Sequence, residues 1–221
     1  MNLQEISAQI GHLFEDMDRA RDRGITETRK IIKSCSLAIR AVHREEFNEA
    51  EQHLREARER LDSICESLRA FPEIFHGGFL QDAQKEYAEA RITFNVVLNK
   101  PIPTPQEVGV EYAPYLNGMA EAVGEMRRHI LDQLRKGSLE KSERVLAVMD
   151  DIFYLLISMD FPDAITRGLR RSTDIARGCL EKTRGDLTNH WAGVKFEREL
   201  SGLRRGLSRE ADQLLQAALR P

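Results

Sequence analysis

The 221-residue sequence has few cysteines, few aromatic residues and no long apolar run. Its cysteines, Cys35, Cys65 and Cys179, are far apart and form no CxxC pair, which argues against a disulfide framework and a zinc knuckle. They are expected to be small core residues in a reducing compartment. Aromatic residues make up 6%, and they do not alternate with basic residues as they do in proteins that stack single-stranded bases.

Membrane-spanning and export signals are also missing from the sequence. The longest apolar stretches, such as 152–159, fall well short of the roughly 20 residues that cross a bilayer. The first residues lack the basic-then-apolar layout of a signal peptide. We therefore predict a cytoplasmic protein with no membrane partner.

Charge of one sign does not dominate either. Lys and Arg number 33 against 36 Asp and Glu, a net charge of −3, which excludes a strongly basic nucleic-acid-coating protein but allows a basic face. Hydrophobic residues make up 41%, enough for a sizeable core, so wholesale disorder is excluded. No glycine-rich phosphate loop, G-x-S-x-G motif, Cys–His pair or Ser–His–Asp cluster is present.

The apolar residues that are present recur every three or four positions nearly everywhere, a helical pattern. Glycine and proline mark the breaks, and Gly24 and Gly185 are each expected to end a helix. The three prolines in 100–105 exclude a helix there. The pattern predicts about seven helices, at 3–21, 26–44, 47–69, 73–98, 114–135, 139–159 and 163–184.

A further helical tail is expected at 191–219, and its apolar residues repeat along a single seam. Such a seam is typical of an oligomer contact or a packing surface. We predict one all-α bundle domain over residues 1–221. The seam consists of Leu200, Leu203, Leu207, Ala211, Leu214 and Ala218.

Two of the expected helices carry paired acids on otherwise apolar stretches. Glu86 and Glu89 are three residues apart, and Glu121 and Glu125 are four apart, so each pair shares a helix face. Like charges this close repel unless something positive lies between them. Two such helices side by side could hold a hard divalent cation such as Mg²⁺, which activates water and neutralises charge on a phosphate. Alternatively, these acids belong to a solvated face.

Two poor helix formers, Gly118 and Gly124, lie near the second pair of acids. They indicate that another helix or a ligand comes close to the backbone there.

Basic stripes run along two other expected helices. Arg170, Arg177 and Arg184 are seven residues apart and share a face, as do Arg29 and Lys33. Such stripes can follow a phosphate backbone. Alternatively, they are solvated faces balanced by glutamates.

Several local motifs, in order along the chain, resemble the translin/TRAX family. The resemblance covers about residues 10–186 and fades over 187–221. The segment 114–118 resembles the family motif D-Y-L-x-G with proline in place of the aspartate, and 120–127 resembles the TRAX segment A-D-L-T-G-E-L-M-R. Further similarities lie at Arg23–Thr26, Val42–Arg44, Phe71–Pro72 with His76, and Arg184–Gly185.

The resemblance implies a functional choice between two kinds of subunit. Translin binds single-stranded nucleic acid and has lost the acidic set, whereas TRAX-like subunits carry a Mg²⁺-dependent endoribonuclease site on two helices. Glu86 and Glu89 match the glutamates of the TRAX segment E-Y-V-E, Glu125 matches a nearby family glutamate, and Glu121 replaces an aspartate, one methylene shorter. The implied catalytic residues are Glu86, Glu89 and Glu121, and the implied ligands of Mg²⁺, or of Mn²⁺, are these three and Glu125.

The resemblance also implies a seven-helix bundle that assembles into a closed, hollow octamer with its sites facing the interior. RNA or single-stranded DNA is the implied partner. A homo-oligomer is the simplest expectation, and a heteromer with a translin-type subunit is the alternative. A catalytically inactive cage and a helical scaffold for a protein partner remain competing readings. The residues implied to hold the nucleic-acid backbone are Arg29, Lys33, Arg127, Arg128, Arg170, Arg177 and Arg184.

Overall fold

The computed structural model describes residues 2–218; the side chains of residue 210 and of residues 212–218 are not described. The described chain forms nine helices and no strand, which confirms the predicted all-α bundle. Six helices are long, and α3, α5 and α8 are single turns of four residues. The bounds are α1 (Leu3–His43), α2 (Phe47–Leu68), α3 (Pro72–Phe75), α4 (Gly78–Val97), α5 (Pro105–Val108), α6 (Tyr112–Arg135), α7 (Leu139–Ser158), α8 (Asp163–Thr166) and α9 (Leu169–Ala218).

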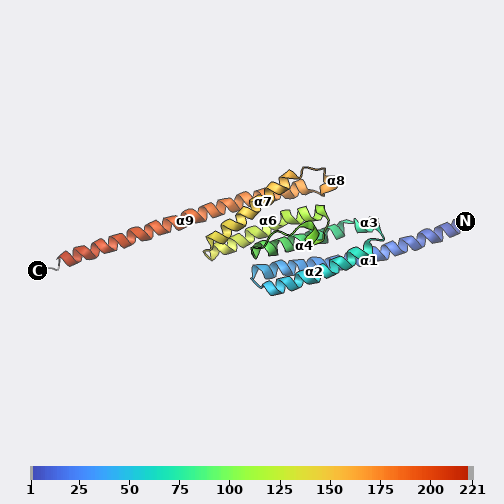
Figure 1. Ribbon diagram of the computed structural model, residues 1–221, viewed down its shortest axis with the longest axis horizontal. Helices are drawn as coiled ribbons and strands as arrows, with labels where there is room; N and C mark the ends of the chain where they lie inside the picture. The colour runs from blue at the N-terminus through green and yellow to red at the C-terminus, as the bar shows by residue number, and fades with distance from the viewer. Residues whose placement is uncertain (1, 219–221) are drawn as a thin grey trace.

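The long helices are arranged in three layers (Figure 1). The hairpin of α1 and α2 forms one layer, α4 and α6 form the middle, and α7 and α9 form the third. The first part of α1 and the last part of α9 project from opposite ends of the bundle. The middle layer is therefore covered on both sides, and the acids predicted to matter lie on its two helices.

The buried positions follow the helical periodicity of the sequence. On α1 the core face consists of Ile31, Cys35, Ala38 and Val42, which recur every three or four residues. On α2 the same spacing runs from Ala50 to Leu68 without interruption. All three cysteines are free, and Cys35 is buried in the core. Among the described residues, no helix combines the length and the apolar character needed to cross a membrane.

The predicted break at Gly24 is wrong, because α1 runs without interruption from Leu3 to His43. Gly24 is buried, and a Cβ at this position would lie 2.7 Å from the Phe79 ring. The glycine makes room for this aromatic ring, which comes from the first turn of α4. Glycine costs a helix about 1 kcal/mol relative to alanine, which is small beside the free energy that packing of this 41-residue helix contributes.

The predicted end at Gly185 is also wrong, because α9 continues from Leu169 to Ala218 and joins the expected seventh helix to the tail. Leu219, the expected end of the tail, lies outside the described residues. The expected start at residue 163 belongs to α8, which is separated from α9 by Arg167 and Gly168, both with positive φ. Similarly, the expected helix over 73–98 is divided, and α4 begins at Gly78.

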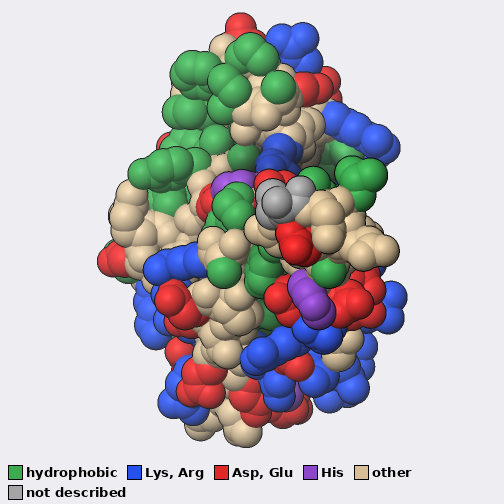
Figure 2. Space-filling model, turned by 90° about the vertical axis from the view of Figure 1, so that its right-hand side faces the viewer, with side chains coloured by type: hydrophobic (Ala, Val, Ile, Leu, Met, Phe, Trp, Pro, Cys, Tyr) green, Lys and Arg blue, Asp and Glu red, His purple; other side chains and the backbone are tan. Residues whose placement is uncertain are grey.

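Exposed apolar side chains gather at the end of the bundle that carries α8. Figure 2 shows this group at the top of the end face, above a lower part in which charged side chains dominate. The exposed apolar residues of this region include Tyr154, Ile157, Phe161 and Ile165. The projecting parts of α1 and α9 expose further apolar residues, among them Phe14, Trp191 and Leu203.

Candidate carboxylate site between α4 and α6

The backbones of α4 and α6 approach each other closely at Gly118. A Cβ at Gly118 would lie 2.5 Å from the Lys85 carbonyl oxygen and 3.0 Å from the Glu89 amide nitrogen. This confirms that Gly118 marks the approach of another helix. Gly124 lies six residues further along α6, and apart from the adjacent part of its own helix no described atom lies within 4 Å of the position of a Cβ. It lines an open hollow instead.

The close contact brings together three of the four acids singled out in the sequence. Carboxylate oxygens of Glu86 and Glu89 on α4 and of Glu121 on α6 all lie within 4.8 Å of one another. All three side chains are partly buried. We call this group the carboxylate cluster.

Glu125 does not join the carboxylate cluster but pairs with a histidine from α1. Its Oε2 lies 2.5 Å from His43 Nε2, and only 4% of the His43 side chain is exposed. The hydrogen bond from His43 holds the pKa of Glu125 below its usual value, although burial opposes this. Arg128 Nη1 lies 4.0 Å from the same carboxylate oxygen. Glu125 is therefore a charged neighbour of the cluster.

Lys85 supplies the positive charge that paired acids require. Its Nζ lies 2.8 Å from a carboxylate oxygen of Glu121 and 3.5 Å from one of Glu86. Burial favours the neutral amine, but the hydrogen bond and charge of Glu121 outweigh this and raise the pKa of Lys85. Lys85 is not among the residues that the sequence singled out; the only signal for it was that paired acids repel unless a positive charge lies between them.

One positive charge does not balance the carboxylate cluster. Burial raises the pKa of Glu89 to about 8, and the charges of Glu86, Glu121 and Glu125 contribute to the shift. Burial also raises the pKa of Glu86, with Lys85 opposing it. At neutral pH Glu89 is therefore protonated unless a cation binds. Three converging carboxylate oxygens fit a hard divalent cation, which prefers oxygen ligands, and Mg²⁺ keeps several waters when bound by a few carboxylates.

Two hollows open beside the carboxylate cluster, and both are lined by Glu121 and Ser172. The first, of about 320 Å³, has a mostly apolar lining: Glu89, Ala120, Glu121, Gly124, Ser172, Ile175, Ala176 and Cys179. The second, of about 420 Å³, is bounded by the starts of α4, α6 and α9 and contains Lys85, Arg167 and Arg171. We call it the basic hollow. The carboxylate cluster is thus reachable from solvent on the side that α9 borders.

The basic residues predicted to hold nucleic acid are distributed over several surfaces. Arg29 and Lys33 are exposed on α1, and no ion pair to either occurs within the described part of the chain. The other five form ion pairs with acids: Arg127 with Asp186 at 2.7 Å, Arg128 with Glu125 at 4.0 Å, Arg170 with Asp160 at 3.2 Å, Arg177 with Asp174 at 3.8 Å and Arg184 with Asp150 at 2.5 Å. Their role in binding remains a prediction.

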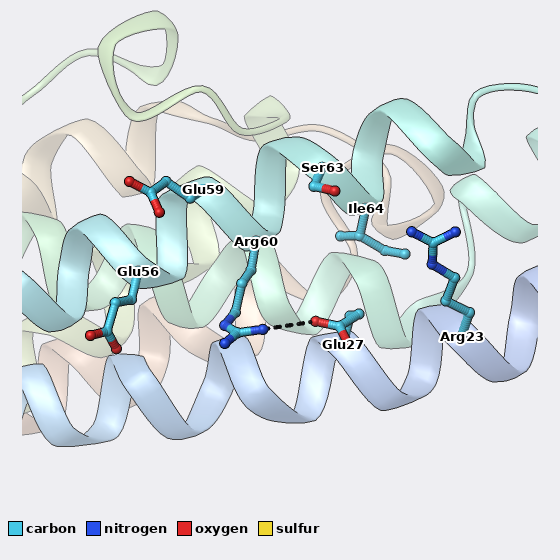
Figure 3. Close-up of a pocket in the computed structure, with 7 residues that line it drawn as sticks. All are labelled: Arg23, Glu27, Glu56, Glu59, Arg60, Ser63 and Ile64. Carbon is cyan, nitrogen blue, oxygen red and sulfur yellow. Dashed lines mark hydrogen bonds and ion pairs between the residues drawn. The ribbon is translucent and has the colours of Figure 1, made fainter.

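A further groove, of about 410 Å³, lies between α1 and α2 (Figure 3). Glu27 and Arg60 meet across it at 3.2 Å. Hydrogen bonds from Lys30 and Arg60 hold the pKa of the Glu27 carboxyl below its usual range. Acids and bases thus alternate on its walls, and none of the acids predicted to bind metal faces it. It is a surface groove with paired charges.

Comparison with known proteins agrees with this architecture. No protein-family model matches the chain. The protein MJ0175 of Methanocaldococcus jannaschii is 30% identical over 210 residues, covering 94% of this chain and 92% of the relative. AfC3PO, for which a crystal structure and a complex with duplex RNA are known, is 32% identical with a TM-score of 0.77, and the match covers 87% of this chain and 98% of AfC3PO.

Apo-NeC3PO shares the fold, with a TM-score of 0.76 at 18% identity over 83% of this chain and 96% of that one. The identities to MJ0175 and AfC3PO extend over nearly the whole of each relative. The ordered motifs and the helical bundle point to the same relationship. The chain therefore belongs to the translin/TRAX family, the family of the C3PO proteins.

Proposed function

We propose that this protein is a metal-dependent endoribonuclease that cleaves single-stranded or short RNA. The observation that carries the proposal is the convergence of Glu86, Glu89 and Glu121 from two helices, with their oxygens within 4.8 Å of one another. Two hollows beside these side chains give a substrate access. RNA as the ligand class is supported by AfC3PO, which was solved with duplex RNA.

In this proposal the three glutamates of the carboxylate cluster hold Mg²⁺ or Mn²⁺, with Glu125 as a fourth acid beside them. A bound divalent ion supplies an activated water and neutralises charge that develops on the phosphate. Glu89 must give up its proton to bind the ion, because its pKa is raised to about 8. His43 keeps Glu125 ionised and oriented, so this carboxylate adds negative charge near the ion at neutral pH.

A catalytically inactive cage that binds RNA or single-stranded DNA is the second candidate. Lys85 favours it, since its ammonium group already lies between Glu121 and Glu86 and serves as a built-in cation. Glu121 is also one methylene longer than the aspartate of TRAX-like proteins, so its carboxylate reaches further from α6. In this reading the carboxylate cluster is a structural ion-pair network.

For the assembly we propose a closed, hollow homo-octamer in the cytoplasm, with nucleic acid inside; a heteromer with a translin-type subunit is the alternative. The projecting parts of α1 and α9 expose apolar stripes that a single copy leaves uncovered. The net charge of −3 fits binding inside a cavity, because basic residues then need to line only the inner face.

The test is cleavage of a labelled single-stranded RNA with Mg²⁺, with Mn²⁺ or with EDTA. We compare the wild type with Glu89→Gln and with the control Glu143→Gln, an exposed glutamate on α7. Wild type and control should cut only with metal. Glu89→Gln should lose about 100-fold or more in rate, since even outer-shell partners of metal ligands account for 10–100-fold.

The outcomes separate the candidates. RNA that binds but stays intact with either metal would contradict the nuclease and favour the cage. A protein that binds no nucleic acid and runs as a monomer or dimer would contradict both, and would favour the helical scaffold for a protein partner.

A further inference from the structure

The basic hollow contains charges that the carboxylate cluster does not use. Its three cationic side chains, Lys85, Arg167 and Arg171, outnumber its two acidic ones, Asp82 and Glu121. Lys85 is engaged by Glu121, whereas the two arginines have no acidic partner in the described structure. Among the described residues, the Arg167 guanidinium donates only to the His76 carbonyl, at 3.3 Å, and the Arg171 side chain forms no hydrogen bond.

The pairing state of these arginines contrasts with that of their neighbour on α9. Arg170 pairs with Asp160 at 3.2 Å and lines a different hollow. Because Arg170 and Arg171 are consecutive in a helix, their side chains leave it in directions about 100° apart. The basic hollow therefore contains two arginines that have no acidic partner among the described residues.

The start of α9 adds further positive potential to the hollow. Arg167 and Gly168 both have positive φ, at 53° and 83°, and α9 begins at the next residue. The first amides of a helix have no intrahelical acceptor, and the dipole of a long helix favours an anion there. Gly168 and Ser172 line the hollow, so this helix start faces it.

A buried acceptor without a donor lies in the same lining. Gln81 is only 5% exposed, and its Nε2 donates to Glu111 Oε2 at 2.6 Å, which fixes the orientation of the amide. Its Oε1 has no hydrogen-bond partner within the described part of the chain. An unpaired buried acceptor is costly, so this atom calls for a donor from outside the chain. A phosphate offers no such donor, whereas a ribose hydroxyl does.

We infer that the basic hollow is a ribonucleotide subsite beside the carboxylate cluster. The phosphate lies between Arg167 and Arg171 at the start of α9, and a ribose hydroxyl donates to Gln81 Oε1. Since Glu121 lines both the hollow and the cluster, the bound nucleotide neighbours the one whose phosphodiester bond lies at the carboxylates. This inference rests on the proposed function, in that RNA is taken as the ligand.

The first test measures binding without cleavage. A fluorescein-labelled 12-nucleotide single-stranded RNA is titrated with protein in EDTA, and anisotropy is recorded over a range of salt concentrations. Arg171→Gln should weaken binding about tenfold, as loss of a charge-assisted contact does. The plot of log affinity against log salt should become shallower by about 0.7, the value for one phosphate of a single strand.

The control is Arg144→Gln, which removes the same charge from an exposed position on α7, away from the hollow. It should change the RNA affinity less than twofold. Thermal unfolding of every variant shows whether it remains folded.

The second test concerns the ribose. Wild type should bind the RNA several-fold more tightly than DNA of the same sequence, because deoxyribose lacks the 2′-hydroxyl. Gln81→Leu should lose this preference. Equal affinity of the wild type for RNA and DNA would overturn the assignment of a ribose hydroxyl to Gln81.

Two failures are distinguishable. Wild type that binds no RNA contradicts the proposed function, and the subsite with it. Wild type that binds RNA while Arg171→Gln behaves like Arg144→Gln overturns the subsite and leaves the proposed function standing.

Discussion

Glu89 is the residue whose ionisation depends most on its surroundings. In the unfolded chain its carboxyl group has an ordinary pKa near 4.5, whereas in the folded protein its pKa is raised to about 8 by burial and by three neighbouring acids. The folded state therefore binds this proton more strongly. The resulting stability is fully present below pH 4.5 and is lost as the pH rises through 8.

Replacing Glu89 with glutamine removes this pH dependence, because glutamine does not ionise. In EDTA, the melting temperature of Glu89→Gln should exceed that of the wild type by an amount that grows from pH 5 to pH 9. Thermal unfolding followed by circular dichroism measures it, with Glu143→Gln as the control. A difference that stays flat across this range would contradict the raised pKa.

The same pair of proteins reports metal binding. A ligand that binds only the folded state raises its stability by RT ln(1 + [L]/Kd). Mn²⁺ or Mg²⁺ should therefore raise the melting temperature of the wild type at pH 8 and leave that of Glu89→Gln nearly unchanged. Equal shifts in both proteins would place the ion elsewhere.

At the scale of residues, the sequence indicated the carboxylates but not their partners. The spacing of Glu86 and Glu89 places them on one face of α4 from the sequence alone. Lys85 meets Glu121 across 36 positions and His43 meets Glu125 across 82. No local pattern specifies such pairs, since they depend on which helices become neighbours.

At the scale of elements, the contact between α4 and α6 depends on the absence of a side chain at Gly118. Gly118→Ala places a methyl group against the Lys85 carbonyl and the Glu89 amide, both backbone atoms. The helices must separate, and we expect a loss of about 1–3 kcal/mol in the free energy of unfolding. Urea denaturation measures it, and metal-dependent stabilisation should weaken in parallel.

Gly124→Ala is the matched control for Gly118→Ala, on the same helix and beside the same site. Apart from the adjacent part of its own helix, no described atom lies within 4 Å of a Cβ there. Alanine should stabilise the protein by about 0.4–1 kcal/mol, because it restricts the unfolded chain and favours the helix. Equal destabilisation by both substitutions would show that the close contact at Gly118 is not the cause.

The predicted helix ends at Gly24 and Gly185 were wrong because they were inferred from neighbours in the sequence alone. Glycine is a weak helix former, so Gly24 and Gly185 looked like ends when only their neighbours in sequence were considered. In the structure both lie inside long helices, α1 and α9. At Gly24 the missing side chain leaves space for the ring of Phe79, a residue 55 positions away in the sequence. The glycine is therefore explained by a tertiary contact and not by a helix end.

At the scale of the whole molecule, the tail of α9 is one of two projecting segments that the bundle leaves uncovered. The exposed fractions of Leu200, Leu203 and Leu207 are 48%, 66% and 67%, and the segment projects beyond the other helices (Figure 1). The side chains of Leu214 and Ala218, which complete the predicted seam, lie outside the described ones. Three large apolar side chains on one face of an unsupported helix are expected to be covered by another copy.

The double variant Leu203→Glu, Leu207→Glu should therefore disrupt assembly. We expect the wild type to run with a mass eight times that of the 25.3 kDa chain and the variant to run with a lower one. Light scattering after size exclusion measures both. Ser201→Glu, which lies away from the seam, should keep the mass of the wild type. A variant that keeps the full mass would remove the seam from the assembly.

The sequence by itself determined the helical class and the core faces, because both follow from propensities and spacings within a few turns. It also placed two acids on α4 and two on α6, and its ordered motifs pointed to the translin/TRAX family. Only the tertiary structure decided that three of these acids converge, that Glu125 pairs with His43, and that two arginines with no acidic partner among the described residues line a hollow beside them. The reason is physical: helix formation depends on neighbours along the chain, whereas the site depends on the close approach of α4 and α6 and on where α9 begins.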